Sequence, residues 1–85
     1  MAWPAWWSWK LELTPHLEER MSDRDFTEVD LRAMLERARS VSPSAVDGRF
    51  VVDVRHRRRP WVVVVEPDRE RRRILVITAY AKESS

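Results

Sequence analysis

The sequence contains no cysteine, and this absence removes two kinds of site. Without a thiol group the chain can form neither a disulfide bond nor a thiolate metal centre. The two histidines, His16 and His56, lie far apart in the sequence and are not accompanied by clustered carboxylates. A histidine metal site is therefore not expected, and we predict a protein that uses no cofactor.

Glycine is almost absent as well. A single glycine, Gly48, cannot build a phosphate-binding loop, a dinucleotide-binding turn or a nucleophile elbow. The chain has no long apolar run, and its aromatic N-terminus lacks the basic residues of a secretory signal and is interrupted by Pro4. We therefore predict a cytoplasmic protein without a membrane span.

Charge is divided unequally along the 85-residue chain. Residues 1–47 contain six basic and nine acidic side chains, whereas residues 48–85 contain ten basic and five acidic ones. Most of the basic residues are arginine, whose planar guanidinium group suits bidentate contact with phosphate and stacking on bases. A GC-rich genome would also produce an arginine bias, but it would not explain why the arginines cluster at two predicted turns.

The second half of the sequence predicts three strands. Residues 49–55 alternate between apolar and polar side chains, residues 61–66 form a valine run between two prolines, and residues 73–80 are rich in β-branched and aromatic side chains. Because the connections are short, we expect antiparallel neighbours. The expected register places Val54 opposite Trp61, and Trp61 opposite Thr78.

Such a meander brings the first turn and the end of the third strand to one edge of the sheet. The side chains expected to gather there are Arg55, His56, Arg57, Arg58, Arg59, Trp61, Thr78 and Tyr80. The arginines near the second turn, residues 69–73, would lie at the opposite end. We expect those arginines to serve solubility or non-specific binding.

The first half predicts a strand and two helices. Residues 7–13 alternate strictly and indicate a further strand of the sheet. A Thr-Pro pair begins a helix over residues 14–23, and a capping box with a hydrophobic staple begins a second helix over residues 27–40. Residues 41–48 are expected to form a loop into the sheet.

The predicted fold class is therefore α+β, in the element order β-α-α-β-β-β. Two N-terminal helices pack on one face of a four-stranded, mostly antiparallel sheet. A single domain covers residues 1–85, and residues 1–6 and 81–85 could be flexible.

Four tryptophans stand close to the N-terminus, namely Trp3, Trp6, Trp7 and Trp9. Trp7 and Trp9 belong to the alternating pattern, whereas Trp3 and Trp6 precede it and could stack on bases, cap the core or form a subunit interface. Core or interface packing is favoured because large aromatic side chains in a small domain usually fill volume. A homodimer through this tryptophan-rich edge is one expectation.

Two segments resemble a small bacterial family described as a domain of unknown function. The first is HLEERMSDRDFTEVDL at residues 16–31, and the second combines VVVE at residues 63–66 with ILVITAY at residues 74–80. The resemblance covers about residues 14–80. That family is similar to the RelE-like and barnase-like ribonuclease toxins and occurs in toxin–antitoxin and polymorphic-toxin settings. The tryptophan-rich start is not part of its pattern.

The resemblance implies a metal-independent endoribonuclease that cleaves RNA by 2′-hydroxyl attack, with a cognate antitoxin as a possible partner. His16, Arg20, Thr78 and Tyr80 are the site positions that it implies. The residue chemistry fits, because RNA cleavage needs a base for the 2′-hydroxyl, cations for the phosphorane and an acid for the leaving 5′-oxygen. A histidine, with a reference pKa of about 6.5, can perform either proton transfer near neutral pH.

The residues expected to contact RNA are Arg55, Arg57, Arg58, Arg59 and Trp61. Each candidate also has an interpretation without a functional role, because His56 and the turn arginines could simply be solvated turn residues. Two rival functions therefore stay open. One is a non-catalytic module that binds nucleic acid through its arginine turns, and the other is a partner-binding protein that uses the tryptophan-rich edge.

Overall fold

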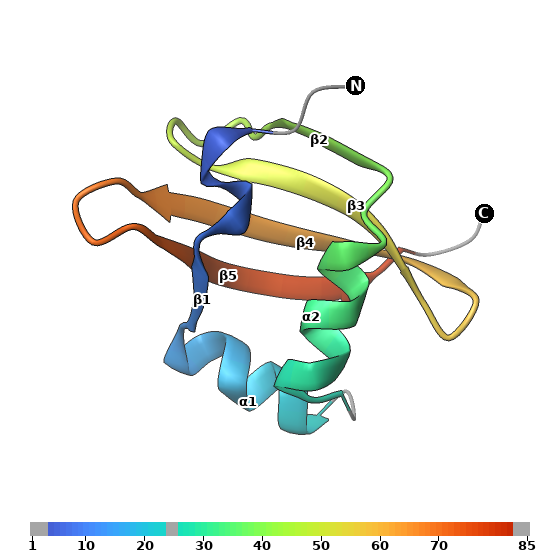
Figure 1. The fold of residues 1–85 in the computed structure, drawn as a ribbon. Coiled ribbons are helices and arrows are strands. Elements are labelled where there is room, and N and C mark those ends of the chain that lie inside the picture. Colours follow the sequence, from blue (N-terminus) through green and yellow to red (C-terminus); the bar gives the residue numbers. More distant parts are fainter. Residues whose placement is uncertain (1–3, 24–25, 83–85) are drawn as a thin grey trace.

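A computed structural model of the protein describes residues 4–23 and 26–82 (Figure 1). Its elements are η1 (Ala5–Ser8, a 3-10 helix), β1 (Lys10–Leu13), α1 (Pro15–Asp23), α2 (Glu28–Glu36), β2 (Ser40–Pro43), β3 (Phe50–His56), β4 (Arg59–Asp68) and β5 (Arg73–Ala81). The strand order in the sheet is β1-β5-β4-β3-β2. Only β1 and β5 pair in parallel within this described part of the chain. The α+β class is thus confirmed, with five strands in place of the predicted four.

The additional strand, β2, lies where a loop was predicted. α2 ends at Glu36 instead of continuing to Ser40, and the chain enters the sheet at Ser40. Ser40 pairs with Asp53 of β3, and its hydroxyl group donates a hydrogen bond to Asp53 Oδ2 over 2.8 Å. A short, polar strand at a sheet edge has little apolar periodicity, so the sequence pattern did not reveal it.

The N-terminal strand is shorter than predicted because its tryptophans form a 3-10 turn. The Trp9 N–H donates to the Trp6 carbonyl over 3.0 Å, and the strand begins only at Lys10. Trp6 is 3% exposed, and its ring centroid lies 5.1 Å from that of Phe50. Burial of this large ring prevails over the alternating pattern of residues 7–9. Trp3 lies outside the described residues.

Both predicted helix starts are confirmed. Thr14 Oγ1 accepts a hydrogen bond from the Leu17 N–H over 3.2 Å and donates to the Val76 carbonyl over 3.1 Å. At α2, Thr27 and Asp30 form the reciprocal bonds of a capping box. The bond from the Thr27 N–H lowers the pKa of Asp30. Thr14 therefore caps α1 and also fixes its first turn to β5.

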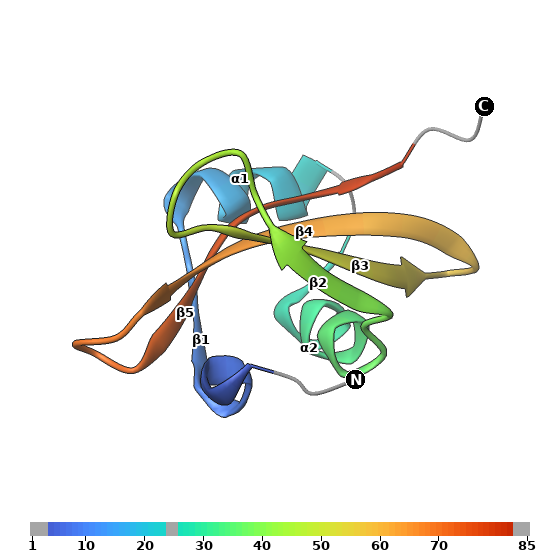
Figure 2. The same ribbon diagram turned by 90° about the horizontal axis from the view of Figure 1, so that it is seen from above.

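The two helices contribute to one core cluster as predicted, but they contact different strands. α1 packs against β5 and lies along it, whereas α2 crosses in front of the strands and contacts β3 (Figure 1). Seen from above, α2 lies on the same side of the sheet as η1 (Figure 2). Thr14 donates hydrogen bonds to the Val76 and Ile77 carbonyls. These bonds hold the start of α1 against β5, directly after the last residue pair between β1 and β5.

The core uses alternate side chains of the central strands. Val63 and Ala79 are fully buried in the core cluster, which also contains Leu17 of α1 and Leu31 of α2. Strand side chains alternate between the two faces of a sheet. Thr78 and Tyr80, which flank Ala79 in β5, therefore lie on the face opposite to the core. Tyr80 is paired there with Val62, which is buried but lies outside the core cluster.

One predicted strand register is confirmed and the other is wrong. Val54 lies opposite Trp61 as expected, but Trp61 lies opposite Ala81, and Thr78 lies opposite Val64. The β4–β5 turn comes later than expected, and a register shift between Val64 and Val65 adds a bulge. Thr78 therefore lies about 10 Å farther along β4 than predicted. A uniform valine run contains no signal for such a bulge.

Candidate nucleic-acid interface

The β3–β4 turn and the end of α2 together form a hollow lined by arginine side chains. Its volume is about 410 Å³, and the residues that line it are Arg37, Arg39, Arg55, Arg57 and Arg58. All five are exposed, and no described acidic residue lines this arginine hollow. Guanidinium groups gathered in one place favour an anionic ligand, although Asp30 already interacts electrostatically with Arg57.

The β3–β4 turn holds two of these arginines in an unusual backbone conformation. His56 pairs with Arg59, so Arg57 and Arg58 form a two-residue loop, and their φ angles are 52° and 65°. This is the hairpin turn with left-handed backbone at both positions, for which Asn-Gly is preferred. A residue with a Cβ atom costs roughly 1–2 kcal/mol in this region. Strain of this kind is concentrated at functional sites, which draws attention to the turn.

Two further arginines of the hollow follow the helix, and the fifth, Arg55, belongs to β3. Arg37 is the C-cap of α2, with its N–H hydrogen-bonded to the carbonyls of the last turn. The Arg39 N–H donates to the Asp53 carbonyl over 2.7 Å, which fixes the connection against β3. Sequence reasoning missed both residues because it extended the helix to Ser40. A usable signal was present, since cationic side chains are favoured at helix C-termini.

A second hollow of about 260 Å³ adjoins the first and shares Arg39 and Arg55 with it. It also contains Lys82 and one carboxylate, Asp53. Lys82 and Ser40 donate hydrogen bonds to Asp53, and these bonds lower the pKa of Asp53. Because Lys82 also pairs with this carboxylate as an ion pair, the negative charge is offset and the surface remains cationic.

A third hollow, of about 390 Å³, combines Arg59 with Tyr80, Trp61 and Ala81. Tyr80 is 41% exposed and lines this hollow. Trp61 is only 7% exposed, and its ring packs edge-on against Phe26 at 5.3 Å between centroids. Trp61 therefore belongs to the core packing and offers no open ring face to a base.

His56 also packs at the core side of the turn. Its ring lies edge-on to that of Trp61, with 5.6 Å between centroids. The His56 Nε2 and Trp61 Nε1 atoms are both buried, and neither has a hydrogen-bond partner among the described residues. His56 is therefore only partly solvated.

The predicted catalytic residues are dispersed over the molecule. His16 and Arg20 are exposed on α1, and neither lines any of the three hollows. Neither residue forms a hydrogen bond or ion pair with another residue in the described ranges that would bring it to the sheet. Thr78 is half-buried opposite Val64. The structure thus joins Tyr80 to Arg59, and Arg55 to the turn arginines, but shows no contact of His16 with either group.

No group of three or more His, Asp or Glu residues in the described ranges is arranged to hold a metal ion. None of the helices in residues 4–23 and 26–82 has the length and apolar character needed to cross a membrane.

Comparison with known proteins identifies one family. The model for "Domain of unknown function (DUF4258)" matches residues 13–83. No curated protein and no solved structure matches the chain. The matched range contains both segments that carry the family resemblance and four of the five strands. The chain belongs to the DUF4258 family of domains of unknown function.

Proposed function

We propose that this protein binds RNA through the arginine hollow. The observation that supports the proposal is the convergence of five guanidinium groups from two separate segments on one surface. Arginine is well suited to phosphate because its planar fork can donate two parallel hydrogen bonds to one phosphate group. Charge neutralisation of this kind supplies most of the affinity in sequence-independent nucleic-acid binding.

The extent of the cationic surface favours a polyanion over a single small anion. The arginine hollow continues through Arg39 and Arg55 into the hollow that contains Lys82. Such a surface offers phosphate contacts at several places, which one isolated phosphate could not use together. A nucleic-acid backbone presents its phosphates in a row, and each contact releases bound counterions.

The experiment compares two charge-matched double variants. Arg37→Gln with Arg39→Gln removes two cations from the hollow, whereas Arg69→Gln with Arg72→Gln removes two exposed cations at the other end of the sheet. We expect the first variant to weaken binding of a short RNA oligonucleotide, measured by fluorescence anisotropy. Its slope of log Kd against log salt concentration should fall by about 2. Equal effects of the two variants would contradict a localised site.

A second candidate function is metal-independent RNA cleavage, and the hollow that joins Tyr80 to Arg59 is the observation that favours it. In this mechanism Arg59 neutralises charge on the phosphorane, and Tyr80 protonates the leaving oxygen or stacks on a base. The family resemblance implies His16 as the general acid or base and Arg20 and Thr78 as supporting residues, but none of these three lines the hollow.

Cleavage is tested with a labelled RNA in the presence and absence of EDTA. The cleavage proposal expects activity that persists in EDTA and falls in both Tyr80→Phe and His16→Ala, with RNA binding retained in each. Activity that requires a metal ion, or an unchanged rate in His16→Ala, would remove this mechanism. RNA binding without turnover in the wild-type protein would leave the binding function alone. A cognate antitoxin and a homodimer remain separate predictions.

A further inference from the structure

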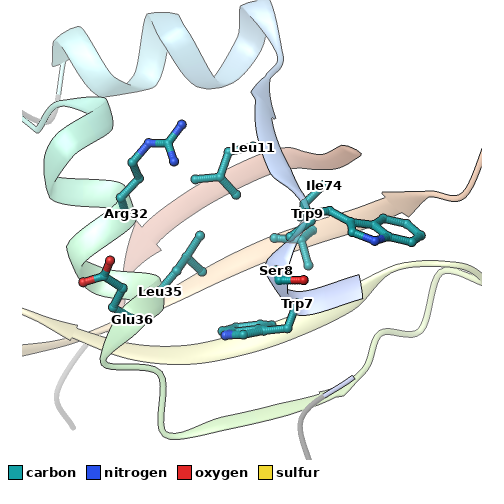
Figure 3. A pocket seen from close by; sticks show the side chains of 9 residues that line it. Trp7, Ser8, Trp9, Leu11, Arg32, Leu35, Glu36 and Ile74 are labelled. Carbon is teal, nitrogen blue, oxygen red and sulfur yellow. The ribbon is translucent and has the colours of Figure 1, made fainter. Parts of the chain in front are cut away.

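An apolar pocket lies on the flank of α2 that faces the N-terminal segment (Figure 3). Its volume is about 190 Å³, and its walls come from η1, β1, α2 and the sheet. The side chains of its apolar lining include Trp7, Leu11, Leu35, Val65 and Ile74. In Figure 3 the indole ring of Trp7 lies on one side of this space and Leu11 on the other. We call this space the tryptophan pocket.

The rim of the tryptophan pocket is charged. Arg32 and Glu36 lie one helical turn apart on α2 and both line the pocket. The Arg32 guanidinium is paired with Glu28 over 3.0 Å, but both side chains are about half exposed. An exposed pair of this kind contributes little to stability, so its partners can be exchanged. Glu36 is exposed. The rim therefore offers both hydrogen-bond donors and an acceptor.

Size and chemistry together restrict the occupant. A cavity of about 150 Å³ holds benzene, so 190 Å³ accommodates one planar ring system. An aliphatic group would fill the apolar part but would leave the charged rim without partners. A nucleobase satisfies both parts, because its face stacks on an aromatic side chain and its edge forms hydrogen bonds.

η1, which lines the tryptophan pocket, and the β3–β4 turn, which lines the arginine hollow, lie on either side of α2 (Figure 1). Glu36 lines the tryptophan pocket and Arg37 lines the arginine hollow, and these residues are consecutive at the end of α2. We propose that the tryptophan pocket accepts one unstacked base of an RNA strand whose phosphates contact the arginine hollow. This inference depends on the proposed RNA binding. It adds a base-binding site to the phosphate contacts of the arginine hollow.

The test separates base binding from phosphate binding. Two oligonucleotides of equal length are compared by anisotropy, one with all its bases and one in which every nucleotide is abasic. We expect the wild-type protein to bind the oligonucleotide with bases roughly five- to tenfold more tightly. Trp7→Leu should abolish this preference while leaving the affinity for the abasic oligonucleotide unchanged. Circular dichroism would confirm that the variant is folded.

A second variant protects the test against loss of folding. Glu36→Gln changes an exposed side chain at the rim and should reduce the same preference. Equal affinity of the wild-type protein for both oligonucleotides would overturn the base pocket and leave the arginine hollow intact. A preference that survives in both variants would also overturn it. Failure to bind either oligonucleotide would overturn both proposals together.

Discussion

Arg57 and Arg58 occupy backbone conformations that few arginines adopt, and the turn they form can be tested directly. Arg57→Asn with Arg58→Gly installs the residues that this turn type prefers. We expect the free energy of unfolding to rise by about 1–2 kcal/mol, since two left-handed residues are relieved of strain. For a domain of this size the melting temperature should rise by roughly 4–15 °C. RNA affinity should fall, because two guanidinium groups leave the hollow.

Arg72 provides a control for the strain argument, because its φ angle is 52° and it lies at the other hairpin. Arg72→Gly should raise stability without changing RNA affinity, since Arg72 does not line the arginine hollow. A double variant at Arg57 and Arg58 that is no more stable than the wild type would contradict the strain. Unchanged RNA affinity in that variant would contradict the hollow.

Asp53 gives the fold a defined acid sensitivity. Hydrogen bonds from Lys82 and Ser40 lower the pKa of Asp53 below its ordinary value of 3.8. A lowered pKa in the folded state means that the contribution to stability is complete above pH 3.8 and is lost as the pH falls below it. Asp53→Asn should lower the free energy of unfolding by about 1 kcal/mol at neutral pH. It should also reduce the loss of stability at acid pH, measured by urea unfolding at several pH values. Asp47→Asn, at an exposed position, is the control and should leave the loss of stability at acid pH unchanged.

At the scale of elements, the attachment of α1 to the sheet depends on one hydroxyl group. Thr14 Oγ1 accepts from the Leu17 N–H and donates to the Val76 carbonyl. Thr14→Ala should therefore lower the free energy of unfolding by about 1–2 kcal/mol, from loss of the cap and an unsatisfied partner. Thr14→Ser keeps the hydroxyl group and should recover most of the loss. Equal urea midpoints for Thr14→Ala and Thr14→Ser would contradict this role.

Elements whose chemistry is local were predictable from the sequence. Thr14 and Thr27 cap helices through neighbours three residues away, and the β3–β4 register follows from a two-residue turn. The elements that were mispredicted depend on distant partners. β2 is a strand only because β3 offers it an edge, and the 3-10 turn of η1 buries Trp6 against Phe50. The bulge between β4 and β5 has no counterpart in the composition of either strand.

At the scale of the whole molecule, the arginine hollow joins the two halves of the sequence. Arg55, Arg57 and Arg58 could be placed together from the predicted meander. Arg37 and Arg39 could not, because their position depends on where α2 ends and on the path of the chain into β2. They lie in residues 1–47, where acidic side chains outnumber basic ones. The net charge of this half therefore gave no indication of a cationic site. The location of His16 likewise depends on how α1 docks, which no local pattern determines.

The two ends of the sheet carry similar numbers of arginines but differ in structure. At the β3–β4 end, α2 brings further cations to the turn, and the guanidinium groups share one hollow. At the β4–β5 end, Arg71 is paired with Glu12 of β1 over 3.3 Å. This difference is why the two double variants above, which remove equal charge, are expected to have unequal effects on RNA binding.

The most direct test of the central claim is an NMR titration of the arginine side-chain Nε–Hε resonances with a short RNA oligonucleotide. The account predicts that the resonances of Arg37, Arg39, Arg55, Arg57 and Arg58 shift together and saturate at one RNA concentration. Raising the salt concentration should reverse these shifts in parallel. Shifts confined to Arg69 and Arg72, or spread evenly over all fourteen arginines of the chain, would contradict an RNA-binding site at the arginine hollow.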